Sequence, residues 1–401
     1  MFHVTDCFDA AYLLNAKMNR YLVDASAHAN HVIVVGSGIC GSTVAAMLAQ
    51  SGLKVTVIDA VAAHKGHIAA ALTPVISSDD NPRSRLSRLG ARLADRYWRD
   101  LQAETGVRFG SACGALQLQR PDGSKRAQDL KAQAEVFAQP HWARWVERDQ
   151  ASELAAIELP RGGIWYPGGW LIQVPELIGL LQATPGVQMM FCEVNSIERA
   201  GQGWLVKDVK GNPLAQGDAV VLANAGDVTG LLKRSGFEQA VSACSRLAAL
   251  HRLAGEITLL PADRLRGGPS CIVGGDGYVL PAIDGWCVSG GTYVRGAQRA
   301  ECTEMGIRTN IDRAGQLLGL SPEIDRYQNL PGWAGWRAVL PGRLPAIGQI
   351  PSMPKLWVFT ANASRGLTWS VLGAMLIRDA LTGQKISIGE LDQRMLSAIE
   401  P

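Results

Sequence analysis

A glycine-rich turn between two short apolar runs most constrains the fold of this chain. His31–Val35 is a β-branched run, residues 42–51 carry apolar side chains at helical spacing, and Lys54–Ile58 is a second apolar run. The pattern predicts a strand, a helix and a second strand in sequence. The turn itself reads G-x-G-x-x-G and consists of Gly36, Ser37, Gly38, Ile39, Cys40 and Gly41.

The residue types of this turn suit a bound diphosphate. Gly36 permits a tight turn, Gly38 lets a pyrophosphate approach the backbone, and Gly41 lets the helix pack closely on the strand. The helix N-terminus offers unpaired N–H groups to the anion. Asp59 follows the second run, where a carboxylate accepts hydrogen bonds from the ribose of an adenosine. The segment therefore predicts dinucleotide binding; the alternative is a tight turn in an unrelated α/β domain.

The composition predicts a compact protein with a substantial core. The chain has 401 residues, of which 47% are hydrophobic, enough for two domains or one elaborate one. No run reaches the roughly 18 uncharged apolar residues of a membrane span, and residues 1–30 lack the apolar block of a secretion signal. We therefore expect a cytoplasmic protein without a membrane partner. The net charge of +3 permits an anionic partner without requiring one.

The eight cysteines are scattered, with no C-x-x-C pair and no Cys/His cluster. This spacing argues against a disulfide framework and against a zinc site, so we predict no metal. Most of the cysteines are expected to be small buried hydrophobic residues.

Asn81-Pro82 predicts the start of a long helix over residues 82–105, because proline at the first helical position sacrifices no hydrogen bond. Arginines recur along it at three- and four-residue spacing and so share one face. Two interpretations stay open: a solvated face paired with local acids, or a surface that contacts a phosphate backbone. These arginines are Arg85, Arg88, Arg92, Arg96 and Arg99.

The rest of the chain alternates strand and helix patterns. We expect a helix from Pro175 to Leu181, and strands over 187–197, 204–209 and 219–222 with hairpin turns between the first three runs. A helix over 301–318 is expected to turn Asn310, Asp312 and Arg313 to solvent. A final strand over 356–360 precedes a helix that ends near Gly383.

The predicted fold class is α/β, with pieces of the dinucleotide-binding module at both ends of the chain and an α+β substrate domain between them. The predicted boundaries are 1–30 for an N-terminal lead-in, 31–110, 175–245 and 335–390 for the dinucleotide-binding domain, and 111–174 and 246–334 for the substrate-binding domain.

Four features together resemble the FAD-dependent amine oxidoreductases related to glycine oxidase and D-amino-acid oxidase. They are the glycine-rich turn with Asp59, a strand ending in Ala225-Gly226, Arg343 followed by Leu-Pro-x-x-Gly, and a Ser-Arg-Gly-Leu helix start at 364–367. The resemblance implies a Rossmann-like FAD-binding domain with an inserted, mainly antiparallel β-sheet domain, and FAD as cofactor. Beyond the turn and Asp59, the residues it places at the cofactor are Ala71, Leu72, Val194, Ala225, Gly226, Ser364, Arg365, Gly366, Leu367 and Thr368.

Shorter motifs look like a narrower group, the C-terminal oxidoreductase half of the bifunctional tRNA 5-methylaminomethyl-2-thiouridine biosynthesis enzymes. They are Ala71–Pro74, Tyr166–Trp170, Gly277–Val279, Gly291–Tyr293 and Ala363–Leu367. This resemblance implies oxidative removal of the carboxymethyl group from 5-carboxymethylaminomethyl-(2-thio)uridine at the wobble position, giving the 5-aminomethyl product and glyoxylate. It also implies that the anticodon stem-loop of tRNA is a partner.

The sequence departs from this group at two points. His64-Lys65-Gly66-His67 stands where a Gly-x-Ser-Gly-Asn-like run is expected, so the backbone near the flavin differs. The methyltransferase half has no counterpart in the chain. We therefore expect this chain to supply the oxidative step, with a separate or fused methyltransferase acting afterwards.

A substrate with an N–CH2–COO⁻ group needs its carboxylate held still beside the flavin. Arg337 stands where the family has its substrate arginine, and its planar fork suits a carboxylate; the alternative is a structural ion pair. The helix start near Gly366 is placed to stabilise negative charge on the flavin. No general base is assigned. Further substrate-binding candidates are His67, Tyr278 and Tyr293 as polar lining, Arg365 at the mouth, and Trp170 stacking an extruded base.

Two competing functions stay open. An oxidase or dehydrogenase of free glycine, sarcosine or a D-amino acid would use the same flavin and the same arginine. A flavoprotein without catalysis, binding tRNA or a methyltransferase partner, would follow if the altered stretch before Ala71 spoils the site.

Overall fold

The computed structural model describes residues 29–61, 67–77, 79–120, 142–320, 330–384, 388–389 and 391–401. The predicted lead-in lies outside this part of the chain up to residue 28, and so do residues 64–66 of the altered stretch. The first described residues lead directly into the glycine-rich unit, which the structure confirms. It consists of β1 (His31–Val35), α1 (Ile39–Gln50) and β2 (Lys54–Asp59).

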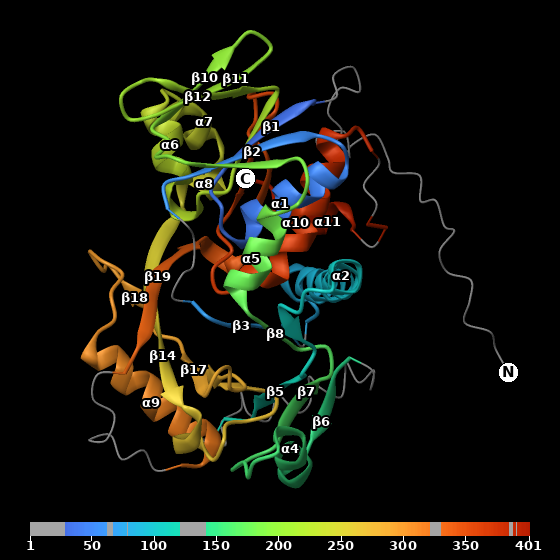
Figure 1. Ribbon diagram of the computed structural model, residues 1–401, viewed down its shortest axis with the longest axis vertical. Helices are drawn as coiled ribbons and strands as arrows, with labels where there is room; N and C mark the ends of the chain where they lie inside the picture. Colours follow the sequence, from blue (N-terminus) through green and yellow to red (C-terminus); the bar gives the residue numbers. More distant parts are fainter. Residues whose placement is uncertain are drawn as a thin grey trace, which may run out of the picture.

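This unit lies within a six-stranded sheet in the upper half of Figure 1. β1 pairs in parallel with β2 on one side and with β13 on the other, because the apolar runs are buried on both faces. The strand order is β20-β21-β13-β1-β2-β9. The added strands are β9 (Val187–Phe191), β13 (Ala219–Leu222), β20 (Ala346–Gln349) and β21 (Leu356–Thr360).

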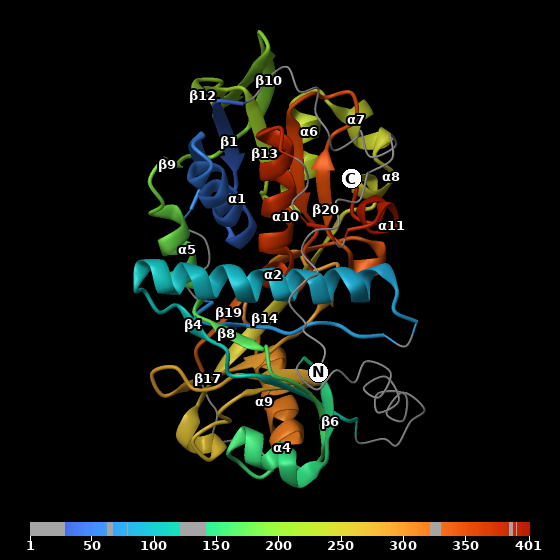
Figure 2. The same cartoon turned by 90° about the vertical axis from the view of Figure 1, so that its right-hand side faces the viewer.

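Three helices pack together on one face of this sheet. Figure 2 shows α2 (Pro82–Thr105) running across the molecule below α1 and α10 (Gly366–Leu381). α2 and α10 approach closely at Gly90, where an added Cβ would lie 2.3 Å from the Thr368 carbonyl oxygen. Residues from both ends of the chain thus share one core, which includes the fully buried Trp357 and Trp369.

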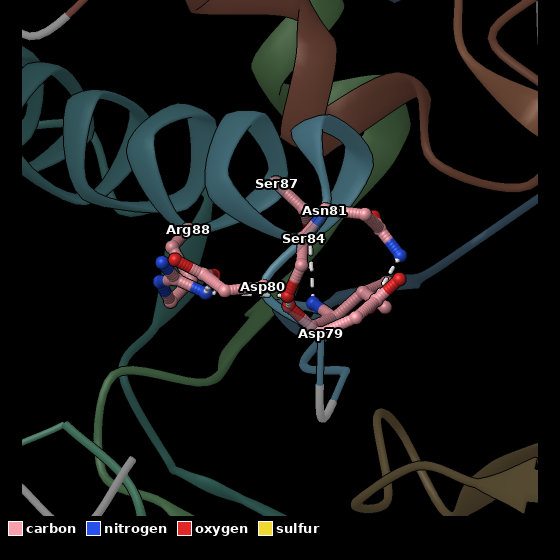
Figure 3. Close-up of polar contacts among 7 residues, drawn as sticks. Asp79, Asp80, Asn81, Ser84, Ser87 and Arg88 are labelled. Carbon is pink, nitrogen blue, oxygen red and sulfur yellow. Dashed lines mark hydrogen bonds and ion pairs between the residues drawn. The ribbon is translucent and has the colours of Figure 1, made fainter. Parts of the chain in front are cut away.

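The structure confirms the predicted limits of α2. The Asn81 side chain caps its start by accepting a hydrogen bond from the Ser84 N–H at 3.1 Å. Figure 3 shows both residues at the start of the helix. Gly106 ends the helix in the left-handed conformation with φ of 71°.

Much of the arginine face of α2 is paired with acids. Arg85 lies 3.1 Å from Asp392, Arg88 lies 2.6 Å from Asp80, and Arg99 lies 2.9 Å from Asp95. Figure 3 shows the Arg88 pair beside the first turns of the helix. These pairs support the interpretation as a salt-bridged face.

A nine-stranded sheet forms the lower half of Figure 1. Its pairings are antiparallel except between β5 and β15. The helix α9 (Glu304–Leu318) covers part of it. The main path is β18-β14-β17-β16-β15-β5-β7-β6, and β19 also pairs with β14. The strands are β5 (Ala115–Leu118), β6 (Arg144–Val146), β7 (Gly163–Tyr166), β14 (His251–Pro261), β15 (Ile272–Gly275), β16 (Gly277–Val279), β17 (Trp286–Gly290), β18 (Val294–Arg295) and β19 (Gly332–Val339).

Two expectations were wrong. The run 187–197 is not one strand, because β9 joins the six-stranded sheet while β10 (Ser196–Ala200) joins a separate antiparallel meander. In that meander β10 pairs with β11 (Gly203–Lys207), and β11 with β12 (Pro213–Gly217), which confirms the hairpin turns. Asn310 does not face solvent: it is fully buried on α9 and donates to the Thr258 hydroxyl at 3.1 Å.

The two large sheets carry different parts of the chain. Because of that separation, we propose the domain boundaries given above.

In the described residues no helix is both long enough and apolar enough to cross a membrane. Of the seven cysteines described, Cys40, Cys244, Cys271 and Cys287 are buried, and none forms a disulfide. The remaining elements are β3 (Ala70–Leu72), β4 (Gly110–Ser111), β8 (Trp170–Ile172), α4 (Arg148–Ala155), α5 (Val174–Gln182), η2 (Ala225–Asp227), α6 (Val228–Arg234), α7 (Glu238–Ala243), α8 (Ser245–Ala248), η3 (Ala262–Leu265), η5 (Pro341–Arg343) and α11 (Gln393–Ser397).

Candidate active site

The N-termini of α1 and α10 meet at one place in the fold. A Cβ added to Gly366 would lie 3.1 Å from the Ile39 side chain, and the Cys40 sulfur lies 3.9 Å from the Gly366 carbonyl oxygen. Neither helix has a side-chain cap or an acid in its first turn, whereas α2, α9 and α11 are capped by side chains. Two positive helix ends with unpaired N–H groups are therefore available to an anion or a carbonyl oxygen.

The glycine-rich turn packs so closely that two of its glycines are required. Gly36 has φ of +105°, and an added Cβ would lie 2.6 Å from the Ala223 carbonyl oxygen. A Cβ at Gly41 would lie 1.9 Å from the Gly36 carbonyl oxygen. The turn is thus held against the end of β13, with its backbone rather than side chains facing the space where α1 begins.

Asp59 braces this turn. Its Oδ2 accepts hydrogen bonds from the Ser37 N–H at 2.6 Å and from the Ser37 hydroxyl at 2.9 Å. Its Oδ1 accepts from the Val61 N–H at 3.3 Å. The carboxylate is therefore fixed at the end of β2, beside the glycine loop, and its contact with a ribose stays a prediction.

Two buried acceptors at the same edge of the sheet lack a partner. Asn224 follows β13 and Asn362 follows β21, and the side-chain oxygen of each is buried without a hydrogen bond. A buried acceptor left unpaired costs about 1–3 kcal/mol, so such atoms mark where a ligand donates. A group with hydroxyl donors and a diphosphate, such as FAD, fits this combination of orphaned oxygens, open helix ends and bare turn.

The structure brings other predicted cofactor residues to this edge. Ala225 begins η2 next to β13, and its carbonyl oxygen accepts from the Thr360 hydroxyl at 2.6 Å. Leu367 and Thr368 are buried in the first turn of α10, and Ser364 is exposed before it. The remaining members are Ala71 and Leu72 in β3, Val194 between β9 and β10, and Gly226 in η2.

Arg337 extends from β19 over Gly255 of the neighbouring strand β14. Its Nη1 donates to the Thr292 carbonyl oxygen at 2.9 Å, and its guanidinium carbon lies 4.5 Å from the centre of the Tyr293 ring. Within the part of the chain that the structure describes, no ion pair joins Arg337 to an acid. The alternative of a structural ion pair therefore has no support there, and most of the fork stays available to a carboxylate.

Tyr278 lies beside the Arg337 guanidinium. Burial raises the pKa of Tyr278 to about 12, while the positive charge of Arg337 opposes part of that rise. A raised pKa keeps the phenol protonated across the physiological range, so it faces the site as a neutral hydrogen-bonding group. Tyr293, by contrast, is 55% exposed and flanks the site from its solvent side.

His67 and Arg365 approach from the segment before α2 and from α10. The His67 ring stacks on Trp333, with ring centres 4.8 Å apart and planes inclined by 16°. Trp333 precedes Arg337 by four residues on β19, so the two side chains share a face of that strand. Arg365 Nη1 donates to the Thr73 carbonyl oxygen at 2.7 Å. The structure thus gathers Arg337, Tyr278, Tyr293 and Arg365, with the His67 ring stacked on Trp333 of the strand that carries Arg337.

The position of Trp170 contradicts its predicted role. Trp170 is only 2% exposed, donates its indole N–H to Asp95 Oδ1 at 2.6 Å, and packs edge-on against Trp98. A base cannot stack on a ring whose faces are covered. Tertiary packing instead uses Trp170 to fasten β8 to α2.

We expect Trp170→Phe to lower stability without affecting catalysis. The variant leaves the Asp95 carboxylate without the indole donor, at a cost of about 1–2 kcal/mol. The thermal midpoint should fall by several degrees in a melting experiment, while KM for the substrate stays within twofold of wild type. A large rise in KM would return Trp170 to the substrate site.

The sequence reasoning missed the glycines that make room for the site. A Cβ at Gly255 of β14 would lie only 1.4 Å from Arg337 Nη1, one at Gly291 would lie 3.0 Å from Arg337 Nη2, and one at Gly290 would lie 2.7 Å from the Tyr278 hydroxyl. A glycine inside a long strand such as Leu253–Leu260 marks a close approach of another group. That signal was present at Gly255, but it could not name the side chain that approaches.

Gly255→Ala tests this arrangement. The added methyl group displaces the Arg337 guanidinium, and a displacement of about 1 Å at a positioning group costs on the order of 100-fold in rate. We expect kcat/KM to fall by about that factor while the protein keeps its flavin and its dithionite-reduced spectrum. Normal steady-state kinetics would mean that Arg337 does not act from this position.

Comparisons with known proteins agree with this geometry. The sequence model of the family described as FAD dependent oxidoreductase matches residues 31–380. The "tRNA 5-methylaminomethyl-2-thiouridine biosynthesis bifunctional protein MnmC" of Cupriavidus metallidurans is 32% identical, with 92% of this chain and 58% of that protein aligned. The protein of the same name from Thiobacillus denitrificans is 31% identical, with 95% and 61% aligned. This chain therefore spans about three-fifths of the length of these relatives.

Two solved structures share the fold. Glycine oxidase from Geobacillus kaustophilus superposes with a TM-score of 0.72 at 20% identity, covering 93% of this chain and 98% of that one. Iminodiacetate oxidase from Chelativorans sp. BNC1 gives a TM-score of 0.72 at 20% identity, covering 92% and 98%.

Proposed function

The chain belongs to the family of FAD-dependent oxidoreductases, with FAD as its cofactor, and on that premise we propose that it oxidises the carboxymethylaminomethyl group of a wobble uridine in tRNA. The methylene carbon loses a hydride and the N–CH2 unit becomes an imine. Water adds to the imine carbon and the C–N bond breaks, which releases glyoxylate and leaves the 5-aminomethyl nucleoside. The tRNA substrate is supported by the names of two relatives whose sequences align over most of this chain.

The observation that carries the proposal is the Arg337 fork beside two tyrosines, which has no acidic partner among the described residues. A carboxymethylamine ends in a carboxylate, and a bidentate Arg–carboxylate contact fixes both its position and its plane. When bound, FAD supplies the acceptor for the hydride. The chain supplies the clamp, and the half-buried setting of Arg337 excludes water that would weaken it.

The proton on the substrate amine must leave before hydride transfer, because an alkylammonium has no lone pair to form the imine. Its ordinary pKa is near 10, and a desolvated site lowers it by disfavouring the charged form. Positive charge from Arg337 adds to that effect. The neutral Tyr278 phenol, whose pKa is raised to about 12, is not an acceptor for this proton near neutral pH.

A second function uses the same groups: oxidation of a free small amino acid such as glycine, sarcosine or a D-amino acid. Arg337 would hold its carboxylate equally well, which is the observation that favours this candidate. A third candidate, a flavoprotein that binds tRNA or a methyltransferase without catalysis, predicts no flavin reduction by any of these substrates. Methylation of the product by a separate or fused enzyme belongs to the same proposal.

Anaerobic mixing distinguishes the three. The holoenzyme is mixed with tRNA carrying 5-carboxymethylaminomethyluridine, with tRNA lacking the modification, and with free glycine or sarcosine, and flavin absorbance is followed. Bleaching by the modified tRNA alone, with one glyoxylate released per flavin, is expected. Bleaching by free amino acids with no preference for tRNA would replace the proposal with the amino-acid oxidase, and no bleaching at all would leave the binding protein.

A further inference from the structure

Three arginines from distant parts of the chain come together beside the active site. Arg83 lies in the first turn of α2, Arg343 ends η5, and Arg365 occupies the N-cap position of α10. Arg365 donates to the Thr73 carbonyl oxygen at 2.7 Å. The chain just after Thr73 is fastened to α2 through Val75, whose carbonyl oxygen accepts from the Ser84 hydroxyl at 3.1 Å and whose N–H donates to the Ser87 hydroxyl at 2.9 Å.

The same turn of α2 is drawn in Figure 3, where Ser84 and Ser87 lie along one side of the helix start. Burial is the main cause that lowers the pKa of Arg83 and of Arg365, and for Arg365 the pKa falls to about 10. The positive charge of Arg343 lowers both pKa values further, and the charge of Arg83 also lowers that of Arg365. The like charges of the three guanidinium groups therefore oppose one another.

No acid compensates this cluster within the described residues. Arg83, Arg343 and Arg365 have no ion pair there, and the Nε of Arg83 is buried without a hydrogen-bond partner. Their neighbours on α2 differ, since Arg85 pairs with Asp392 and Arg88 with Asp80. The first turn of α2 also contains no acid, so the positive helix end adds to the repulsion.

The cluster is separate from the carboxylate clamp but adjoins it. Tyr293 lies under the Arg337 guanidinium and is close enough to Arg365 to influence its pKa. Arg343 is exposed, whereas Arg83 and Arg365 are half-buried. A positive track thus runs from the clamp outwards. A substrate carboxylate at Arg337 leaves the three outer guanidinium groups available to a second anion of the same substrate.

We propose that Arg83, Arg343 and Arg365 form a phosphate-binding subsite at the entrance to the active site, which holds a phosphodiester of the RNA next to the oxidised nucleotide. The subsite rests on the proposed function for the identity of that RNA. Arginine forks match phosphate oxygens in geometry as well as charge. A phosphate contact fixes the register of the strand without reading its sequence, so the base is selected at Arg337 and the tyrosines.

The test measures RNA binding by the holoenzyme directly. The variant is Arg83→Gln with Arg343→Gln; Arg365 is kept because it occupies the N-cap position of α10, where we propose that the cofactor binds. The probe is a fluorescein-labelled anticodon stem-loop RNA with ordinary uridine at the wobble position. Anisotropy gives Kd between about 50 and 200 mM KCl, a range over which phosphate contacts weaken steeply. Arg308→Gln, which removes one positive charge from an exposed arginine of α9, is the matched control for each of the single variants Arg83→Gln and Arg343→Gln.

We expect the double variant to bind at least tenfold more weakly, with the slope of log Kd against log salt reduced by about 1–2, because each single-strand contact contributes about 0.7. Arg308→Gln should keep the wild-type slope. Replacing Arg83 and Arg343 by lysine should restore part of the affinity, which a merely misfolded variant would not show. Flavin content at wild-type level confirms that each variant is folded.

Unchanged affinity in the double variant overturns the subsite, and so does an equal loss in Arg308→Gln, since that would indicate diffuse attraction. No RNA binding by the wild type overturns it as well. The two proposals fail separately: weakened binding without flavin reduction by modified RNA keeps the subsite and rejects the reaction. Flavin reduction with no effect of the double variant keeps the reaction and rejects the subsite.

Discussion

Arg337→Gln is expected to abolish most turnover while leaving the flavin bound. Glutamine removes the charge and the fork that would hold the substrate carboxylate beside Tyr278 and Tyr293. Losing one partner of a hydrogen-bonded charge pair in a partly desolvated site costs about 2–5 kcal/mol, or roughly 30- to 5000-fold in kcat/KM. Steady-state kinetics with modified tRNA, together with the flavin absorbance of the purified variant, measure both halves of this prediction.

Arg337→Lys separates charge from geometry. Lysine keeps one positive charge but offers a point donor in place of the planar fork, so we expect activity between that of wild type and Arg337→Gln. The stacking over Tyr293 is also reduced. A lysine variant as active as wild type would show that only charge matters, and a glutamine variant with normal kinetics would remove Arg337 from the mechanism.

Gly41→Ala is expected to lose FAD. The added methyl group would lie 1.9 Å from the Gly36 carbonyl oxygen, so the turn must move away from the end of β13. Overpacking of this kind costs about 1–3 kcal/mol, which corresponds to about 5- to 150-fold weaker cofactor binding when the strain falls on the bound conformation. The variant should purify with little colour and should require excess FAD for activity, as a titration of flavin fluorescence would show.

Gly179→Ala is the matched control for that substitution. Gly179 lies inside α5, and an added Cβ meets nothing within 4 Å. The exchange should raise stability by up to about 1 kcal/mol, because alanine favours a helix more than glycine does. FAD content should match that of wild type. If Gly41→Ala also purified with full FAD content, the close packing of the turn would not be what holds the cofactor.

Local chemistry along the sequence predicted the cofactor module well. Local neighbours within a few residues determine the turn at 36–41, the capped start of α2 at Asn81 and the buried strands β1 and β2. The sequence pattern therefore predicts them without knowledge of the tertiary structure. The burial of Asn310 and the end of the strand within 187–197 depend instead on residues far away in the chain. Asn310 is buried because Thr258 of β14 accepts its hydrogen bond. The strand β9 ends early because the residues that continue it, in β10, pair in a different sheet.

What the sequence by itself determined is the kind of cofactor: a glycine-rich turn and an acid after the next strand specify dinucleotide binding through residue type and spacing. Tertiary structure decided the rest, because each remaining feature needs groups far apart in the chain. It packs Trp170 against α2 and places the Arg337 guanidinium over Gly255, which has no side chain. It also brings Arg83, Arg343 and Arg365 together without an acidic partner among the described residues. Distances between such groups are set by sheet pairing and helix packing, which no local pattern encodes.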